Sequence, residues 1–230
     1  MENFKVIFYM GSPIISISPI ILDSLISLCK AKEILGEKFY MTQGNISGSI
    51  EEIEAMLNPI LDKKYGVYCT SYGIGDFKEY KTTWSKRWDS ETDEVVRLSN
   101  SKKRVDVGAG HYKNYHMPML VKSYKTLVFY VRGDMKEIKR LLETYLTNIG
   151  KKASQGYGEI LKMEFIKTQE NYSIEKDNKL MRHIPAKNNI SLFDEKYNNI
   201  CLTHNFETQA ILPPYWRKEK ELCIMPNIKY

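Results

Sequence analysis

The chain has 230 residues, of which 43% are hydrophobic and 27% are charged, and its formal net charge is +6. These are ordinary values for a globular protein of one or two domains, and they argue against disorder, collagen and coiled coils. No stretch of 18 or more apolar residues occurs, and the N-terminus lacks the basic and apolar regions of a signal peptide, so we expect a cytoplasmic protein without a membrane span.

The first quarter of the sequence predicts one strand and two helices. Residues 4–10 form an apolar run that glycine and proline end, which is typical of a strand. Apolar side chains at helical spacing predict a helix over residues 19–35, with Gly36 as its stop. Ser49 and Glu52 form a candidate capping box, so we expect a shorter helix to follow.

A β-hairpin is predicted next. Residues 67–72 and 77–84 have the composition of strands and flank a turn at residues 73–76 that contains two glycines. Residues 84–104 look irregular and charged, so we expect an insertion in this part of the chain.

The second half contains the clearest patterns. Residues 127–131 form a continuous apolar run, which is typical of a buried central strand. Asp134 and Glu137 have the spacing of a helix capping box, and apolar residues trace one stripe from there to Gly150. Residues 160–166 then alternate as a strand, so a helix packed between two strands is predicted.

The order of these elements is that of a ferredoxin-like (RRM-like) α+β sandwich, in which helices cover one face of an antiparallel sheet. We predict such a domain over residues 1–168, with the β-hairpin insertion around residues 65–110. Residues 169–230 are polar and irregular, and we expect them to form a C-terminal extension packed on the domain. A nucleic acid would then have the open face of the sheet. Because this arrangement hosts many unrelated activities, the loops must indicate the function.

The positive charge is concentrated in one segment. Residues 1–100 carry 11 Lys and Arg against 14 Asp and Glu, and residues 169–230 carry 9 against 8, whereas residues 101–168 carry 14 against 6. A concentrated positive field attracts polyanions over about 10 Å in 0.1 M salt, and nucleic acid is the commonest polyanion in a cytoplasm. A solubilising lysine surface is the alternative, and charge alone does not decide between the two.

The most specific feature is the loop at residues 150–159, between the second helix and the last strand. It is not a Walker loop, because it follows a helix and precedes a strand. Glycines let backbone N–H groups approach a phosphate closely, while lysine, serine and glutamine add charge and hydrogen bonds, and tyrosine can stack on a base. The candidate RNA contacts are Lys151, Lys152, Ser154, Gln155, Gly156, Tyr157 and Gly158. The alternative is that the glycines only satisfy turns.

Four cysteines are too few and too widely spaced for a disulfide framework, so we expect reduced, mostly buried thiols. Cys201 and His204 have the spacing of half a zinc site, but no second pair follows to complete four ligands. The sequence therefore predicts neither a metal nor a cofactor.

Motifs spread over nearly the whole chain carry a resemblance to a known family. They lie at residues 22–26, 110–115, 130–134, 149–158, 180–185 and 213–216, with a later Cys223. Together they resemble a RAMP-superfamily subunit of CRISPR effector complexes, most closely the type IV small backbone subunit that binds the guide RNA 5′ handle. The glycine-rich loop is shared across that superfamily, whereas the last two motifs are what point to type IV.

The resemblance implies a non-catalytic subunit that binds the 5′ handle of the guide RNA (crRNA) and caps a filament of larger backbone subunits. The implied partners are the crRNA, the backbone and large subunits of the complex and, as a further candidate, target DNA. Besides the loop, the implied RNA contacts are His111, Tyr112, Lys113, Arg132 and Arg104. Trp84 beside Lys86 and Arg87 suits a stacking platform, although such a Trp also commonly packs. Arg182 and Trp216 are expected to be structural or interface residues.

An endoribonuclease on the same fold that processes CRISPR repeat RNA is the main alternative. Metal-independent cleavage needs a general base near a 2′-OH and an acid at the leaving oxygen. His111, Lys113, Tyr115 and His116 lie close together in sequence and have the required chemistry. A third alternative is a relative that binds a host effector protein without RNA.

Overall fold

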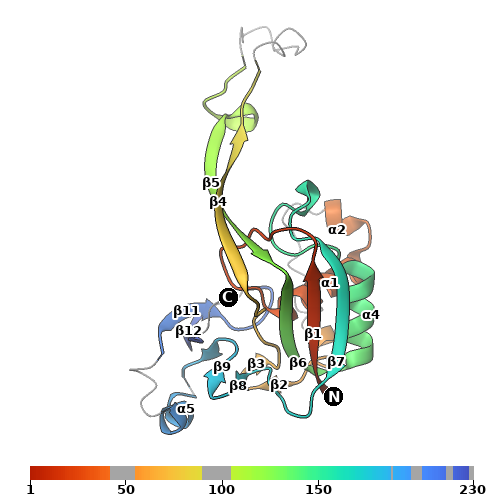
Figure 1. The fold of residues 1–230 in the computed structure, drawn as a ribbon, viewed down its shortest axis with the longest axis vertical. Helices are drawn as coiled ribbons and strands as arrows, with labels where there is room; N and C mark the ends of the chain where they lie inside the picture. Colours follow the sequence, from red (N-terminus) through yellow and green to blue (C-terminus); the bar gives the residue numbers. More distant parts are fainter. Residues whose placement is uncertain (42–54, 90–104, 188, 198–203, 216–219, 228–230) are drawn as a thin grey trace.

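The computed structural model describes residues 1–41, 55–89, 105–187, 189–197, 204–215 and 220–227. Figure 1 shows a body made of a sheet and helices, a long two-stranded arm that projects from it, and a group of short strands beside it. The fold is therefore mixed, with small antiparallel sheets and few helices. No helix in these described ranges is long and apolar enough to cross a membrane.

Three strands form the central antiparallel sheet, in the order β6-β1-β7. They are β1 (Glu2–Met10), β6 (Thr126–Gly133) and β7 (Ile160–Lys167), which confirms the three predicted strands. The prediction that residues 127–131 form a buried central strand holds for only one face of β6, because buried and partly exposed side chains alternate along it. The strand order places β1 in the middle of the three strands, and its Phe4, Val6 and Phe8 point to the face that the helices cover, where they enter the core.

Two helices cover this face of the sheet, α1 (Leu22–Leu35) and α4 (Met135–Tyr145), and both were predicted. The Asp134 carboxylate accepts hydrogen bonds from the backbone N–H groups of Lys136 and Glu137, at 3.0 and 3.1 Å, and so caps α4. The other half of a capping box does not form, because the Asp134 amide donates to Ile60 O. α4 also ends before Gly150, although the buried Ile149 continues its apolar stripe.

The predicted hairpin is wrong, because residues 67–72 and 77–84 do not pair with each other. The observed antiparallel pairs are β2 (Lys63–Lys64) with β3 (Val67–Tyr68), and β4 (Phe77–Lys86) with β5 (Tyr115–Tyr124). β4 and β5 form the hairpin arm, which includes residues 87–89 and 105–114 at its outer end. The prediction failed because the true partner of β4 lies about thirty residues further along the chain.

The two glycines that suggested a turn serve close packing instead. Ile74 forms an isolated β-bridge with Val128, and Thr70 forms another with Val131, so residues 70–74 run beside β6. A Cβ atom on Gly75 would lie 2.2 Å from the carbonyl oxygen of Thr126. Glycine is therefore needed here for a close approach between two backbones.

The C-terminal part is more regular than predicted. Its elements are β8 (Glu175–Lys176), β9 (Lys179–Leu180), β10 (Ile184–Pro185), α5 (Ile190–Tyr197), β11 (Phe206–Ala210) and β12 (Lys220–Ile224). Several of them enclose a second apolar cluster that also includes Val67 and Cys69. The division of the chain at residue 168 stays a prediction.

Other local predictions have mixed outcomes. The short helix α2 (Lys38–Met41) follows α1, whereas the capping box at Ser49 and Glu52 lies outside the described residues. Three cysteines are free and buried, as expected, namely Cys29, Cys69 and Cys223. Cys201 is not among the residues that the structure describes.

A buried ion pair joins the C-terminal part to α1. Arg182 and Asp23 are both 0% exposed, and Arg182 Nη1 lies 2.9 Å from Asp23 Oδ2. The same nitrogen donates to the carbonyl oxygen of Tyr68 at 2.7 Å and to Thr70 Oγ1 at 3.0 Å. The Tyr215 hydroxyl donates to the Asp23 carboxylate at 2.8 Å. Arg182 is thus a structural residue, as the sequence predicted.

His183 lies beside this pair and is held neutral. Its Nε2 is 2.9 Å from the carbonyl oxygen of Ala210, which can only accept, so Nε2 carries the proton. Its Nδ1 then accepts a hydrogen bond from the Tyr72 hydroxyl at 2.7 Å. Burial, together with the positive charge of Arg182, lowers the pKa of His183 to about 3.

Removing one member of the ion pair should destabilise the protein strongly. In the Asp23→Ala protein, the buried charge of Arg182 loses its partner, so we expect the free energy of unfolding to fall by about 3–5 kcal/mol. Chemical denaturation measures this change. The double variant Asp23→Leu with Arg182→Met removes both charges and should recover much of the loss. An Asp23→Ala protein as stable as the parent would show that the pair contributes nothing.

Stability should also depend on pH through His183. The unfolded chain binds a proton below pH 6.5, the ordinary value for His, whereas the folded chain does not until about pH 3. The free energy of unfolding should therefore fall with pH below 6.5, by up to about 1.4 kcal/mol per pH unit. Denaturation between pH 6.5 and 4.5 should show a shallower slope for His183→Gln. Parallel slopes for the two proteins would contradict a neutral buried His183.

Candidate nucleic-acid interface

The glycine-rich loop lies at one end of the sheet, where α4 leads into β7. Its two ends are tied to the segment that follows β1. The Lys151 amide donates to Ile15 O, and the Gly158 amide donates to Pro13 O, each at 2.8 Å. The Glu159 amide donates to Ser12 Oγ, also at 2.8 Å. The base of the loop is therefore fixed by the body of the protein.

Two of the loop glycines are required by packing. Gly150 has a φ of +83°, and a Cβ atom there would lie 2.8 Å from Ile15 O. Gly158 has a φ of +69°, and its Cβ atom would lie 1.8 Å from Ile149 O. By contrast, Gly156 faces open space. Its φ of +82° is nevertheless a left-handed conformation that favours glycine, so the structural explanation also applies to the centre of the loop, through the turn and not through packing.

The centre of the loop is a single 3-10 turn, η3 (Ala153–Gln155). Two amides are used within it, because Gln155 N donates to Lys152 O and Gly156 N donates to Ala153 O. The amides of Lys152, Ala153 and Ser154 donate to no residue in the described part of the chain. The predicted phosphate contact would therefore have three successive amides at its disposal, beside the exposed side chains of Ser154 and Gln155.

The two loop lysines have different surroundings. Lys151 is exposed, and Lys152 is partly buried. Among the described residues, neither pairs with a carboxylate. Lys152 Nζ lies 3.0 Å from the centroid of the Trp84 ring, on the arm. The structure thus brings the loop and the predicted stacking residue together. Tyr157 is partly buried, and its carbonyl oxygen accepts from Asn148 Nδ2 at 3.0 Å.

One face of the arm forms a small aromatic platform. Trp84 lies directly opposite Met117, and the next pair on the same face is Lys86 with Tyr115. The rings of Trp84 and Tyr115 are inclined by only 14°, and Trp84 Nε1 donates to Tyr115 Oη at 2.5 Å. Met117 is 53% exposed. Sequence reasoning missed Met117, because only the pairing of β4 with β5 brings it to Trp84.

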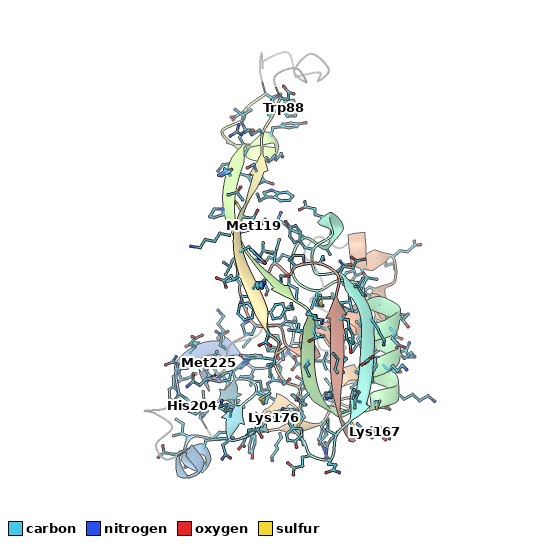
Figure 2. All side chains as sticks on the ribbon, viewed as in Figure 1. Trp88, Met119, Lys167, Lys176, His204 and Met225 are labelled. Atoms are coloured by element: carbon cyan, nitrogen blue, oxygen red, sulfur yellow. The ribbon has the colours of Figure 1, made fainter. Side chains whose placement is uncertain are left out.

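The arm also carries an excess of positive charge. Its described residues, 77–89 and 105–124, contain six Lys and Arg against three Asp and Glu. Tyr112 belongs to the short turn η2 (Gly110–Tyr112) and packs edge-on against Trp88, with ring centroids 4.8 Å apart. Figure 2 shows Trp88 near the outer end of the arm. Lys113 is exposed beside it.

Arg132 is a predicted contact that lies away from the loop. Arg132 pairs with Asp62 at 2.7 Å and lies opposite Asn3 in the sheet. Asn3 and the loop are at opposite ends of β1, roughly 30 Å apart at the usual rise per residue. The side chain of His111 and all of Arg104 lie outside what the structure describes.

The open face of the sheet was the expected place for a nucleic acid, but several of its polar groups are already paired with one another. The Tyr9 hydroxyl donates to Glu164 at 3.0 Å, and Lys162 donates to Glu164 at 2.6 Å. These two hydrogen bonds lower the pKa of Glu164, so it stays charged. Lys176 donates to the Tyr130 hydroxyl at 2.8 Å. A ligand on this face would first have to break these contacts.

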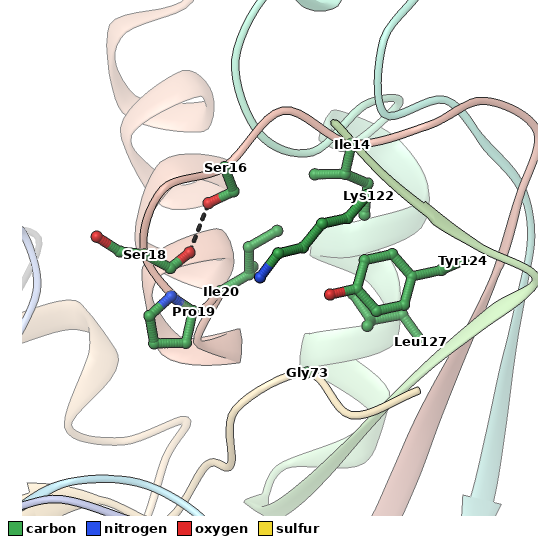
Figure 3. A pocket seen from close by; sticks show the side chains of 9 residues that line it. All are labelled: Ile14, Ser16, Ser18, Pro19, Ile20, Gly73, Lys122, Tyr124 and Leu127. Carbon is green, nitrogen blue, oxygen red and sulfur yellow. Dashed lines mark hydrogen bonds between the residues drawn. The ribbon is translucent and has the colours of Figure 1, made fainter. Parts of the chain in front are cut away.

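A cavity at the base of the arm is too small for a ligand. Figure 3 shows the side chain of Lys122 entering it between Ile20 and Tyr124. Its volume is about 20 Å³, which is room for roughly one water molecule. Ser16 Oγ at its rim donates to the carbonyl oxygen of Ser18. The loop and the arm, rather than this cavity, form the candidate interface.

Comparison with known proteins identifies the family. The model of the family described as "CRISPR type IV associated protein Csf3" matches residues 76–226, well over half of the chain. The matched region includes both strands of the arm, the glycine-rich loop and the C-terminal strands. No curated protein matches the sequence. The resemblance to a type IV CRISPR protein is thereby confirmed, and the chain belongs to the Csf3 family of CRISPR type IV associated proteins.

Proposed function

We propose that this Csf3-family protein binds the 5′ handle of the crRNA as a non-catalytic subunit of a type IV CRISPR effector complex, and caps the end of its backbone filament. The observation that carries the proposal is the centre of the glycine-rich loop. Three successive amides there, those of Lys152, Ala153 and Ser154, have no partner among the described residues, and neither Lys151 nor Lys152 pairs with a carboxylate there. Backbone amides and lysines are the groups that bind nucleic-acid phosphates.

The order of elements supports a ferredoxin-like RAMP fold. Residues 70–74 bridge to the free side of β6, so the order across the sheet is residues 70–74, β6, β1 and β7. Both helices pack on one face. This is the arrangement expected for a ferredoxin-like sandwich in which the second strand is reduced to isolated bridges. The glycine-rich loop then precedes its last strand, as the resemblance to the RAMP superfamily implies.

The arm supports RNA rather than a protein as the partner. It adds exposed Lys113 and a net positive charge to the side of the molecule that carries the loop. Partly exposed aromatic rings interleaved with Lys and Arg, such as those of Trp84 and Trp88, suit unpaired bases.

Reversing the charge of Lys151 should weaken RNA binding. Lys151→Glu loses one phosphate contact and repels the backbone, so we expect the affinity for a repeat-derived RNA to fall tenfold or more. The slope of log affinity against log salt should fall by about 0.7. Filter-binding titrations over a range of salt concentrations measure both quantities.

Lys167→Glu is the matched control. Lys167 is 68% exposed and pairs with Phe4 at the opposite end of the sheet from the loop (Figure 2). It undergoes the same charge reversal, so it should change the affinity much less than Lys151→Glu. Equal losses in both variants would mean that only the overall charge attracts RNA. Unchanged affinity of Lys151→Glu would refute the assignment of the loop.

We further propose that the chain does not cleave RNA. Tyr115 and His116 are neighbours in β5, so their side chains point to opposite faces of the arm. His116 Nδ1 hydrogen-bonds Ser85 Oγ at 2.5 Å, and the two residues are exposed. The acid and the base of a cleavage reaction must both come within hydrogen-bond reach of one scissile phosphate, which side chains on opposite faces of a strand do not.

A nuclease assay separates binding from cleavage. We expect the parent protein and His116→Ala to leave a labelled repeat RNA equally intact, as resolved on a denaturing gel. Lys167→Glu serves again as the control for preparation-dependent contaminants. Cleavage by the parent that His116→Ala abolishes would establish the endoribonuclease instead.

A further inference from the structure

We propose that Lys152 and Trp84 form a binding site for one nucleotide of single-stranded RNA. The phosphate binds the ammonium group of Lys152, and the base stacks on the indole face of Trp84. In the chain without RNA, the ammonium group of Lys152 lies against the indole ring of Trp84. The proposal rests on the proposed function and goes beyond it, because it assigns the arm and the loop to one site with two chemically distinct halves.

A nucleotide could replace the contact between Lys152 and Trp84, because its phosphate can bind the ammonium group and its base can stack on the indole. Lys152 Nζ lies 3.0 Å from the ring centroid, so the ammonium covers the π face of the indole. Among the described residues it has no carboxylate partner. A cation held by a ring face is held more weakly than one in a charge-assisted hydrogen bond to phosphate. A phosphate that reaches the loop would therefore draw Lys152 away from the ring.

The indole that Lys152 would uncover is fixed in place. Trp84 Nε1 donates to Tyr115 Oη, and the two rings are nearly parallel, with an angle of 14° between their planes, so the hydrogen bond fixes the orientation of the indole. Met117 lies directly opposite Trp84 and is 53% exposed, which adds an adaptable apolar edge. A ring held in one orientation loses little freedom when a base stacks on it.

The backbone of the loop also favours the movement of Lys152 from the Trp84 ring to a phosphate. Lys152 has a φ of +63°, a conformation that is uncommon outside glycine, and its side chain leaves the loop toward the arm. Its own amide and the next two have no partner among the described residues. A phosphate bound by these amides would therefore lie within reach of Nζ, and the attached base would lie on the side of Trp84.

Two variants and two probes test the site. The probes are a short oligouridylate and an oligomer of the same length whose riboses lack bases. Trp84→Leu should lower the affinity for oligouridylate roughly tenfold and leave the affinity for the abasic oligomer unchanged, because only the base stacks on the indole. Lys152→Met should lower the affinity for both probes and reduce the salt slope by about 0.7.

A conservative variant guards against a merely structural effect. Trp84→Phe keeps an aromatic face and should retain most of the affinity for oligouridylate, whereas a loss equal to that of Trp84→Leu would overturn the stacking role. Equal losses for both probes in Trp84→Leu would overturn it too, because the Trp would then only shape the arm. Circular dichroism and thermal melting establish that each variant is folded.

A fluorescence titration follows the exchange directly. In the Trp88→Phe and Trp216→Phe background, Trp84 is the single tryptophan. Oligouridylate should change its emission, and Lys151→Glu should shift that change to higher RNA concentration. RNA binding that depends on Lys151 but leaves Trp84 emission and Trp84→Leu affinity unchanged would overturn this proposal alone. Failure of the parent protein to bind either probe would overturn the proposed function as well.

Discussion

The buried ion pair between Asp23 and Arg182 links three parts of the fold. Two charges that leave water each cost several kcal/mol, and this cost is offset only if every hydrogen-bonding site finds a partner. Here Arg182 also bonds Tyr68 and Thr70, and Tyr215 completes the shell of Asp23. The pair therefore fixes α1, residues 68–70 and the C-terminal part in one arrangement. Asp23 lies before the region that matches the family model, and Arg182 lies within it, so both parts are needed for this core.

The same body positions the candidate site through the segment that follows β1. Ile14 exchanges backbone hydrogen bonds with Lys122 of β5, at 2.8 and 2.9 Å, and so anchors the arm. The carbonyl oxygens of Pro13 and Ile15 accept from the two ends of the glycine-rich loop. Residues 13–15 thus fix the position of both the base of the arm and the base of the loop. The approach of Lys152 to Trp84 follows from these anchors, and a change at Ile14 would alter both halves of the site together.

Sequence patterns predicted correctly those elements that depend on interactions between residues close together in the chain. The stripe of apolar side chains after Asp134 and the cap formed by Asp134 identified α4, because both signals lie within one stretch of chain. The hairpin prediction failed because Gly73 and Gly75 fit a turn and a close approach to β6 equally well in the sequence. The loop was recognised as a phosphate-binding candidate, but its contact with Trp84 joins residues that are far apart in the chain. Such a contact depends on the pairing of β4 with β5, which no nearby residue specifies.

The paired groups on the open face of the sheet favour the loop and the arm over the sheet as the proposed site for RNA. Tyr9, Lys162 and Glu164 satisfy one another there, so a ligand would exchange existing contacts for new ones of similar strength. At the loop, three amides and Lys151 exchange only water for phosphate. Binding strength follows the difference between the free and bound states. The strongest gain is therefore expected where the free chain leaves its donors unpaired, and where the segment of highest positive charge contributes both the loop and β5.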